Sequence, residues 1–190
     1  MNLINYKIIE LSELKFSLYK VQKFLLNLIK KEYGLNYIPK FHKDIELLKN
    51  FYIAPVRNTF FLAINTKTNE IIGSIGIREY DRKSECFENN FSRKSTASFY
   101  KVFVDEKYRR NGIASALVKK AEKFCYNQGY NEIYLHTQNI VDGALFFWNK
   151  MNFNIIFKVN DKLDTVHMSK NIYRAPLKLY DISLTSIQAK

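Results

Sequence analysis

One stretch of the chain decides the fold: Val102-Phe103-Val104-Asp105-Glu106-Lys107-Tyr108-Arg109-Arg110-Asn111-Gly112-Ile113-Ala114. It begins as a strand of β-branched and aromatic residues, continues as a short basic loop, and ends in small residues that open a long amphipathic pattern. The first turn of a helix has free N–H groups, and its dipole favours negative charge at that end. The stretch therefore predicts an anion site at the junction of a strand and a helix.

The junction does not match the two common glycine-rich phosphate motifs. No Gly-Lys-Ser/Thr follows, as a P-loop requires, and the three glycines of the dinucleotide fingerprint are missing. Gly112 and Ala114 are small enough for a phosphate to approach the backbone, while Arg109 and Arg110 add cationic donors. The alternative interpretation is an ordinary strand–helix turn, so the flanking segments must distinguish the two.

Strand and helix patterns alternate on both sides of this junction. Before it, the patterns predict strands over residues 6–11, 60–64, 70–80 and 98–104, helices over 14–29 and around 39–48, and a loop over 81–96. After it, they predict a helix over 113–125, a strand over 133–137, a helix from an N-cap at Asp142 through 151, and strands near 154–159 and 165–169. The order βααβββαβαββ is typical of a single mixed α/β domain.

Composition narrows the class of protein. The 190 residues, 47% of them apolar, suit one well-filled domain rather than a disordered chain. The two cysteines, Cys86 and Cys125, exclude a disulfide framework, and with three scattered histidines they predict no metal site. No run approaches the roughly 18 apolar residues of a membrane span, and no secretory signal is visible. We expect a cytoplasmic protein with no membrane partner.

The excess of positive charge permits an anionic partner without identifying one. The chain has 30 Lys and Arg residues against 18 Asp and Glu, a net charge of +12. These basic residues are dispersed, which is typical of a solvated surface. A nucleic-acid partner is therefore the weakest hypothesis for the function of this chain. The positive charge also favours an acidic or neutral substrate over a polycation.

The residues around the junction resemble the GNAT N-acetyltransferase superfamily. Residues 109–114 fit its acyl-CoA signature, Arg/Gln-x-x-Gly-x-Gly/Ala, after a strand that ends in Val-Asp. Residues 144–153 look like the family's later helix, and residues 166–170 are similar to its His-Met-x-Lys ending. The likeness covers roughly residues 4–170. It implies an α/β (α+β mixed) GNAT domain over residues 1–172, with a mostly antiparallel central sheet splayed at the cofactor site, and a C-terminal extension over 173–190.

The resemblance also implies a co-substrate, acetyl-CoA, and the residues that bind it. The backbone of Val102, Phe103 and Val104 would face the pantetheine arm. The pyrophosphate would lie on the loop made by Arg109, Arg110, Asn111, Gly112, Ile113 and Ala114. Asn139 would contact the cofactor, and Trp148 would form a wall beside the thioester or the acceptor.

Three residues leave the acid/base chemistry open. Trp148 stands where the family usually has a tyrosine as general acid, and an indole does not donate a proton at neutral pH. Ser98 occupies a strand position where some subgroups carry a base-forming glutamate, so it would orient a water. Glu79, at the end of a strand, would accept the proton of the amine directly or through water. The structural alternatives are core packing for Trp148, an ordinary strand hydroxyl for Ser98, and an ion pair with Arg78 or Arg82 for Glu79.

The predicted function is direct transfer of an acetyl group from acetyl-CoA to a primary amine. Direct transfer needs no cysteine nucleophile, so Cys125 is predicted to be a core residue. The alternative function is a CoA-binding regulatory or interaction module with weakened catalysis. The acceptor stays open among small amines, polyamines, antibiotics, peptide N-termini and lysine side chains, and a homodimer also stays open.

Overall fold

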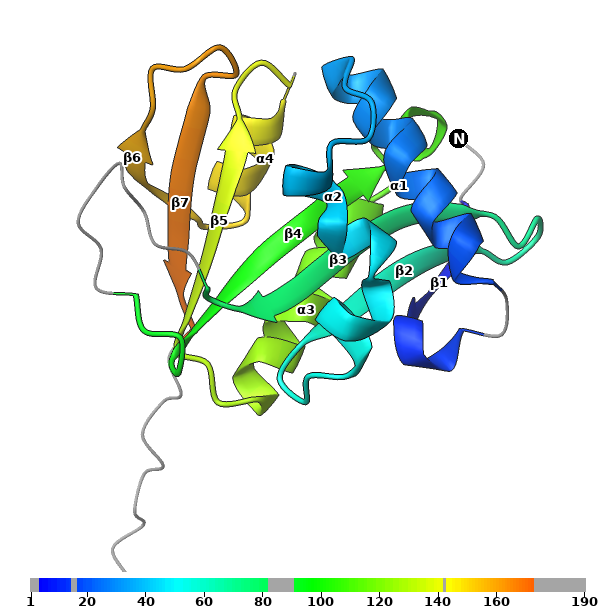
Figure 1. Cartoon of the computed structure of the whole chain (residues 1–190), viewed down its shortest axis with the longest axis horizontal. Coiled ribbons are helices and arrows are strands. Elements are labelled where there is room, and N and C mark those ends of the chain that lie inside the picture. Colours follow the sequence, from blue (N-terminus) through cyan, green and yellow to red (C-terminus); the bar gives the residue numbers. More distant parts are fainter. Residues whose placement is uncertain (1–3, 15–16, 82–90, 142, 173–190) are drawn as a thin grey trace, which may run out of the picture.

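The computed structural model describes residues 4–14, 17–81, 91–141 and 143–172, which form one seven-stranded sheet with helices on both faces (Figure 1). The strands are β1 (Tyr6–Glu10), β2 (Thr59–Asn65), β3 (Ile71–Glu79), β4 (Thr96–Val104), β5 (Glu132–Gln138), β6 (Asn154–Lys158) and β7 (Thr165–Asn171). The helices are α1 (Leu18–Tyr33), α2 (Pro39–Glu46), α3 (Ile113–Asn127) and α4 (Ala144–Lys150), with short turns η1 (Leu11–Glu13), η2 (Lys49–Ile53) and η3 (Glu106–Tyr108).

The order of these elements agrees with the order expected from the sequence, and the mixed α/β fold class is confirmed. The strands lie in the order β1-β2-β3-β4-β5-β7-β6, and only β4 and β5 run parallel. The N-cap expected at Asp142 lies outside the described residues, and α4 begins after Gly143, whose φ of 73° is left-handed. Much of the loop expected over 81–96 also lies outside them.

Two layers of core side chains hold the helices against the sheet. On one face, α3 packs on the middle strands through Leu117, Val118 and Ala121, and the predicted core residue Cys125 is fully buried there. On the other face, α1 and α2 cover β2 through a second cluster that includes Leu25. Figure 1 shows α1 and α2 in front of the strands and α3 behind them.

The close fit of α3 depends on a glycine in β3. A Cβ atom added to Gly73 would lie 3.1 Å from the side chains of both Ile113 and Leu117, at the start of the helix. The absence of a side chain at position 73 therefore lets the first turns of α3 lie directly on the sheet. This contact positions the junction of strand and helix over residues 102–114.

The parallel strands β4 and β5 pair for only part of their length. Their register joins Thr96 to Glu132, Ala97 to Ile133 and Ser98 to Tyr134, and it ends there although both strands continue. Figure 1 shows the two strands diverging from this paired end. The predicted splay of the sheet is thus present between β4 and β5.

Candidate active site

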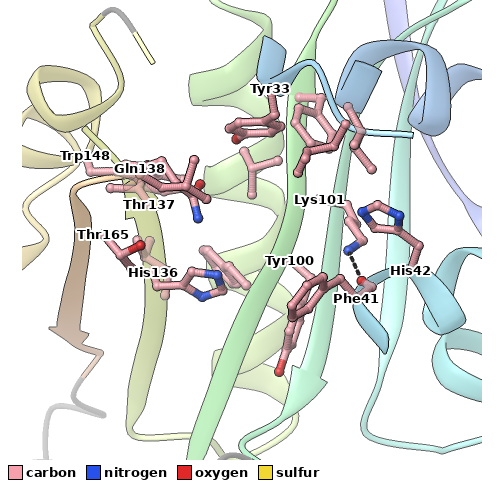
Figure 2. A pocket seen from close by; sticks show the side chains of 17 residues that line it. Tyr33, Phe41, His42, Tyr100, Lys101, His136, Thr137, Gln138, Trp148 and Thr165 are labelled. Atoms are coloured by element: carbon pink, nitrogen blue, oxygen red, sulfur yellow. Dashed lines mark hydrogen bonds between the residues drawn. The ribbon is translucent and has the colours of Figure 1, made fainter. Parts of the chain in front are cut away.

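The splay opens into a cavity of about 380 Å³ between β4 and β5. Figure 2 shows its wall: Tyr100 and Lys101 come from β4, His136 from β5, and Trp148 from α4. The end of α1, the start of α2 and the turn between β6 and β7 complete the wall. The cavity is mostly apolar, with a few polar groups, which is the usual composition of a small-molecule site.

A β-bulge lies at the edge of this cavity. The pairing of β3 with β4 shifts between Ser74 and Gly76, so that two residues of β4 face one residue of β3. Lys101 takes up the extra length with a φ of 50°, and its carbonyl accepts a hydrogen bond of 2.8 Å from the Ser74 hydroxyl. Because a bulge leaves its extra residue outside the ladder, backbone groups here remain available to a ligand. They lie next to Val102, Phe103 and Val104.

The loop before α3 has the backbone of an anion site. Arg110 and Gly112 have left-handed φ values of 64° and 74°, and nothing lies within 4 Å of a Cβ atom placed on Gly112. The N–H of Ala116 bonds back to the Gly112 carbonyl at 3.0 Å, which marks the first turn of α3. The N–H groups that precede it have no acceptor within the helix. The open space over Gly112 and these donors suit a phosphate.

The side chains of this loop have different surroundings. Arg109 donates to the Val104 carbonyl at 3.2 Å and forms an ion pair with Glu32 of α1, so it ties the loop to β4 and α1. The Asn111 amide donates to two carbonyls of the same loop. The Ile113 side chain is buried in the core, which anchors the first turn of α3 on the sheet. Arg110 is exposed to solvent.

Comparison with known proteins identifies the family of this chain. Residues 23–153 match the family model described as the acetyltransferase (GNAT) family. The chain belongs to the GNAT family. The predicted family and fold are therefore confirmed, and acetyl-CoA is the co-substrate that this family uses.

Curated relatives of this GNAT chain are N-acetyltransferases. It is 27% identical to human N-acetyltransferase 8 over 137 residues, which are 70% of this chain and 56% of that protein. It is 25% identical to N-acetyltransferase 8 of Rattus norvegicus over 119 residues, 62% of this chain and 50% of that protein. The chain thus spans about half the length of the curated relatives it matches.

Solved GNAT structures superpose on nearly the whole described fold. An acetyltransferase of the GNAT family from Staphylococcus aureus Mu50 has a TM-score of 0.70 and 25% identity, covering 88% of this chain and 99% of its own. An aminoglycoside 6'-N-acetyltransferase complexed with coenzyme A has a TM-score of 0.65 at 18% identity, covering 90% and 99%. The second likeness concerns the fold alone.

Two predicted GNAT site residues lie outside the cavity wall. Asn139, expected at the cofactor, is exposed and donates from its amide to Asp164 at 2.7 Å, which fastens the turn between β6 and β7. Glu79, expected at the acceptor, has one carboxylate oxygen 3.1 Å from Arg57 and the other 3.0 Å from Arg93. Glu79 is the last residue of β3 and lies opposite Ala97, at the paired end of β4. Both side chains therefore serve contacts within the protein.

Trp148 and Ser98, the two site residues at which the sequence departs from the usual GNAT residue, lie at the splay. Trp148 is 6% exposed, lines the cavity, and packs edge-on against Phe147 and Phe153 at ring distances of 5.0 and 5.1 Å. It is thus both a core residue and a cavity wall. Ser98 is 1% exposed at the last paired position of β4, and its hydroxyl has no hydrogen-bond partner among the described residues.

Two histidines of the cavity wall were not singled out by the sequence. The Nδ1 atom of His42 accepts a hydrogen bond of 2.9 Å from the Ile38 N–H, and burial, followed by the nearby Lys101, lowers the pKa of His42. A neutral His42 therefore carries its proton on Nε2, so it donates rather than accepts there. His136 faces the cavity from β5, on the side opposite to His42 (Figure 2).

Alternation along β5 is the signal that could have found His136. Ile133 and Leu135 point to the α3 face, where both are buried in the core, so Tyr134 and His136 point to the other face. Tyr134 is sealed at the paired end, whereas His136 lies beyond the last paired residue. The position of that last pair is a property of the sheet, and a single sequence does not contain it.

Proposed function

We propose that this chain transfers an acetyl group from acetyl-CoA to a primary amine without a covalent enzyme intermediate. The observation that carries the proposal is the splay: the cavity, the bulge and the loop before α3 lie at the same end of β4. This arrangement of the loop, the bulge and the cavity suits a ligand with a pyrophosphate at one end and a thioester at the other. Family membership and the N-acetyltransferase relatives support it.

The residues of β4 and of the loop before α3 keep the roles expected for them as part of the proposal, whereas Asn139 does not. The backbone of Val102, Phe103 and Val104 holds the pantetheine arm, and the loop of residues 109–114 holds the pyrophosphate mainly through backbone N–H groups and Arg110. When bound, acetyl-CoA supplies the acetyl group and a thiolate leaving group. Backbone N–H groups at the bulge polarise the carbonyl as negative charge develops on its oxygen. The walls orient the amine toward that carbon.

His136 is proposed as the base, in place of Glu79. The amine must lose a proton to react, since an alkyl ammonium of pKa about 10.4 is almost fully protonated at pH 7. Glu79 lies outside the cavity wall with both oxygens paired to arginines, and His42 donates rather than accepts. His136 lines the cavity and can accept the proton directly or through a water held near Ser98. Trp148 supplies a wall and no proton.

The test compares two substitutions that remove a proton acceptor. His136→Gln should lower kcat about 100-fold to 10,000-fold, because general base catalysis is typically worth that much. Glu79→Gln is the matched control and should keep turnover. Release of CoA from acetyl-CoA, measured with a thiol reagent across a library of amines and peptides, gives the rate, and mass spectrometry identifies the product. A Glu79→Gln variant as slow as His136→Gln would contradict this assignment of the base.

The regulatory alternative makes a different prediction in the same assay. A CoA-binding module without catalysis would bind acetyl-CoA in calorimetry and acetylate no member of the library. Trp148, at the family's tyrosine position, is the observation that supports this alternative.

Among the described residues, none of the helices has the length and apolar composition that a membrane span requires.

A homodimer stays open, and two expectations from the sequence stay predictions: a cytoplasmic location and a C-terminal extension over residues 173–190. For the last, Ile172 packs on the core and its N–H donates to the Asn131 carbonyl at 2.8 Å. A domain over residues 1–172 would therefore keep this contact.

A further inference from the structure

The side of the cavity that faces α1 and α2 is aromatic and apolar. Tyr33 is the last residue of α1, Leu35 follows two residues later, and Phe41 lies in α2. Tyr100 stands on β4 across from His136 (Figure 2). The hydroxyl of Tyr33 stays neutral, because burial, followed by the Glu32 charge, raises its pKa to about 12. This side therefore offers large, uncharged surfaces to an acceptor.

Charge in the wall comes from one lysine. Lys101 is the one lysine, arginine, aspartate or glutamate among the described residues that line the cavity. Its side chain is 15% exposed, and its ammonium donates to the Phe41 carbonyl at 3.3 Å and lies 3.3 Å from a carboxylate oxygen of Asp44. Asp44 is behind the wall, where its other oxygen accepts a bond of 2.6 Å from the Tyr52 hydroxyl. Lys101 is thus held at the wall by buried contacts.

From this wall we propose that the acceptor is an amine with a single positive charge on an apolar body, and that Lys101 sets this specificity by excluding a second cation. The inference rests on the proposed acetyl transfer and names its substrate class. A second ammonium group would lose its hydration in the cavity and meet no carboxylate in the described wall. It would also approach the ammonium side of the Lys101–Asp44 pair, because Asp44 lies behind Lys101.

The inference divides the acceptors that the sequence left open. Apolar monoamines and peptide N-termini without neighbouring cations fit the wall. Polyamines and polycationic antibiotics do not. Substrates of one length that differ only at the far end separate these classes: hexylamine ends in a methyl group, 1,6-diaminohexane in an ammonium, and 6-aminohexanoate in a carboxylate.

The first measurement is kcat/KM of the full-length chain for these three amines at saturating acetyl-CoA. We expect 1,6-diaminohexane to be at least tenfold poorer than hexylamine, although it offers two amino groups. We expect 6-aminohexanoate to exceed the diamine, because Lys101 tolerates an anion. A diamine that equals or exceeds hexylamine would overturn the proposal, whatever any variant does.

The second measurement assigns the discrimination to Lys101. Lys101→Met keeps the length of the side chain and removes its charge, so it should bring the diamine to within about threefold of hexylamine. Lys101→Arg keeps the charge and should keep the preference. The double variant Lys101→Met/Asp44→Asn controls for the carboxylate that the single variant leaves without its lysine. An unchanged preference in a folded Lys101→Met variant would remove Lys101 from the proposal.

Failure of the proposed function has a separate signature. If none of the three amines is acetylated and the wider library also gives no product, while acetyl-CoA still binds in calorimetry, acetyl transfer itself is wrong. If other amines are acetylated and these three follow the opposite order, only the acceptor class is wrong.

Discussion

The two ends of the β4–β5 pair use the same strand alternation for different purposes. At the paired end, Tyr134 is 2% exposed, its hydroxyl lies 2.6 Å from Nδ1 of His167, and its ring is 5.2 Å from Tyr80. At the open end, two residues further along β5, His136 lines a cavity across from Tyr100. Where neighbouring strands pair, polar side chains are sealed and add stability. Where the strands diverge, side chains of the same face become a site.

The largest effect that would separate the two ends comes from the open end. Gly112→Glu should abolish acetyl-CoA binding, more than 100-fold in calorimetry, because it places bulk and negative charge over the first turn of α3. Gly34→Glu is the matched control, since Gly34 has a similar φ of 67° and also has nothing within 4 Å of an added Cβ. Both variants carry the same backbone strain, and only the first should lose binding. Unchanged acetyl-CoA affinity in a folded Gly112→Glu protein would remove the loop from the cofactor site.

A smaller effect is expected from the wall of the open end. Trp148→Phe should lower kcat less than tenfold, because thiolate is a tolerable leaving group and the indole donates no proton. Trp148→Tyr, which restores the family's usual residue, should give no gain. Both rates are read beside the melting temperature, because Trp148 also packs on Phe153. A gain in turnover for Trp148→Tyr would favour the regulatory module with weakened catalysis.

The smallest effect belongs to the paired end and concerns stability. Tyr134→Phe removes the hydroxyl that bonds His167 and should lower the free energy of unfolding by about 1 kcal/mol, the usual contribution of one hydrogen bond. Its kcat should stay within twofold, because Tyr134 is sealed away from the cavity. Denaturant unfolding and the CoA-release assay measure the two quantities on the same protein. A large loss of turnover without loss of stability would show that the paired end takes part in the chemistry.

The order of strands and helices was readable because it depends on local patterns. The apolar face of residues 113–125 has helical spacing, and the helix observed over Ile113–Asn127 buries that same face, including Leu117 and Cys125. The parallel pairing of β4 and β5, with a helix between them, also follows from the order of the elements. The end of β3 differs by one residue from the expected one: the strand was expected to reach Tyr80 and ends at Glu79.

The backbone of the proposed anion site was readable for the same reason, whereas the partners of Glu79 were not. Gly112 and its neighbours are consecutive, so their backbone geometry follows from a few residues. The surroundings of Glu79 depend on Arg57 and Arg93, and neither arginine is a neighbour of Glu79 in the sequence. Arg78 and Arg82 were the partners expected for Glu79 as a structural alternative. Arg78 pairs with Asp81 instead, and Arg82 lies outside the described residues. Long-range ion pairs leave no pattern in one sequence.

The sequence by itself determined the family, the mixed α/β fold and the order of strand, loop and helix around Gly112, because short-range spacing encodes each of them. Only the tertiary structure decided where β4 and β5 separate, and with that which side chains meet at the cavity. It placed Lys101 at the wall against Asp44, placed Glu79 between two arginines, and placed His136 in the cavity wall. The reason is physical: a side chain's chemistry depends on its neighbours across the sheet, and those neighbours are set by strand pairing rather than by proximity along the chain.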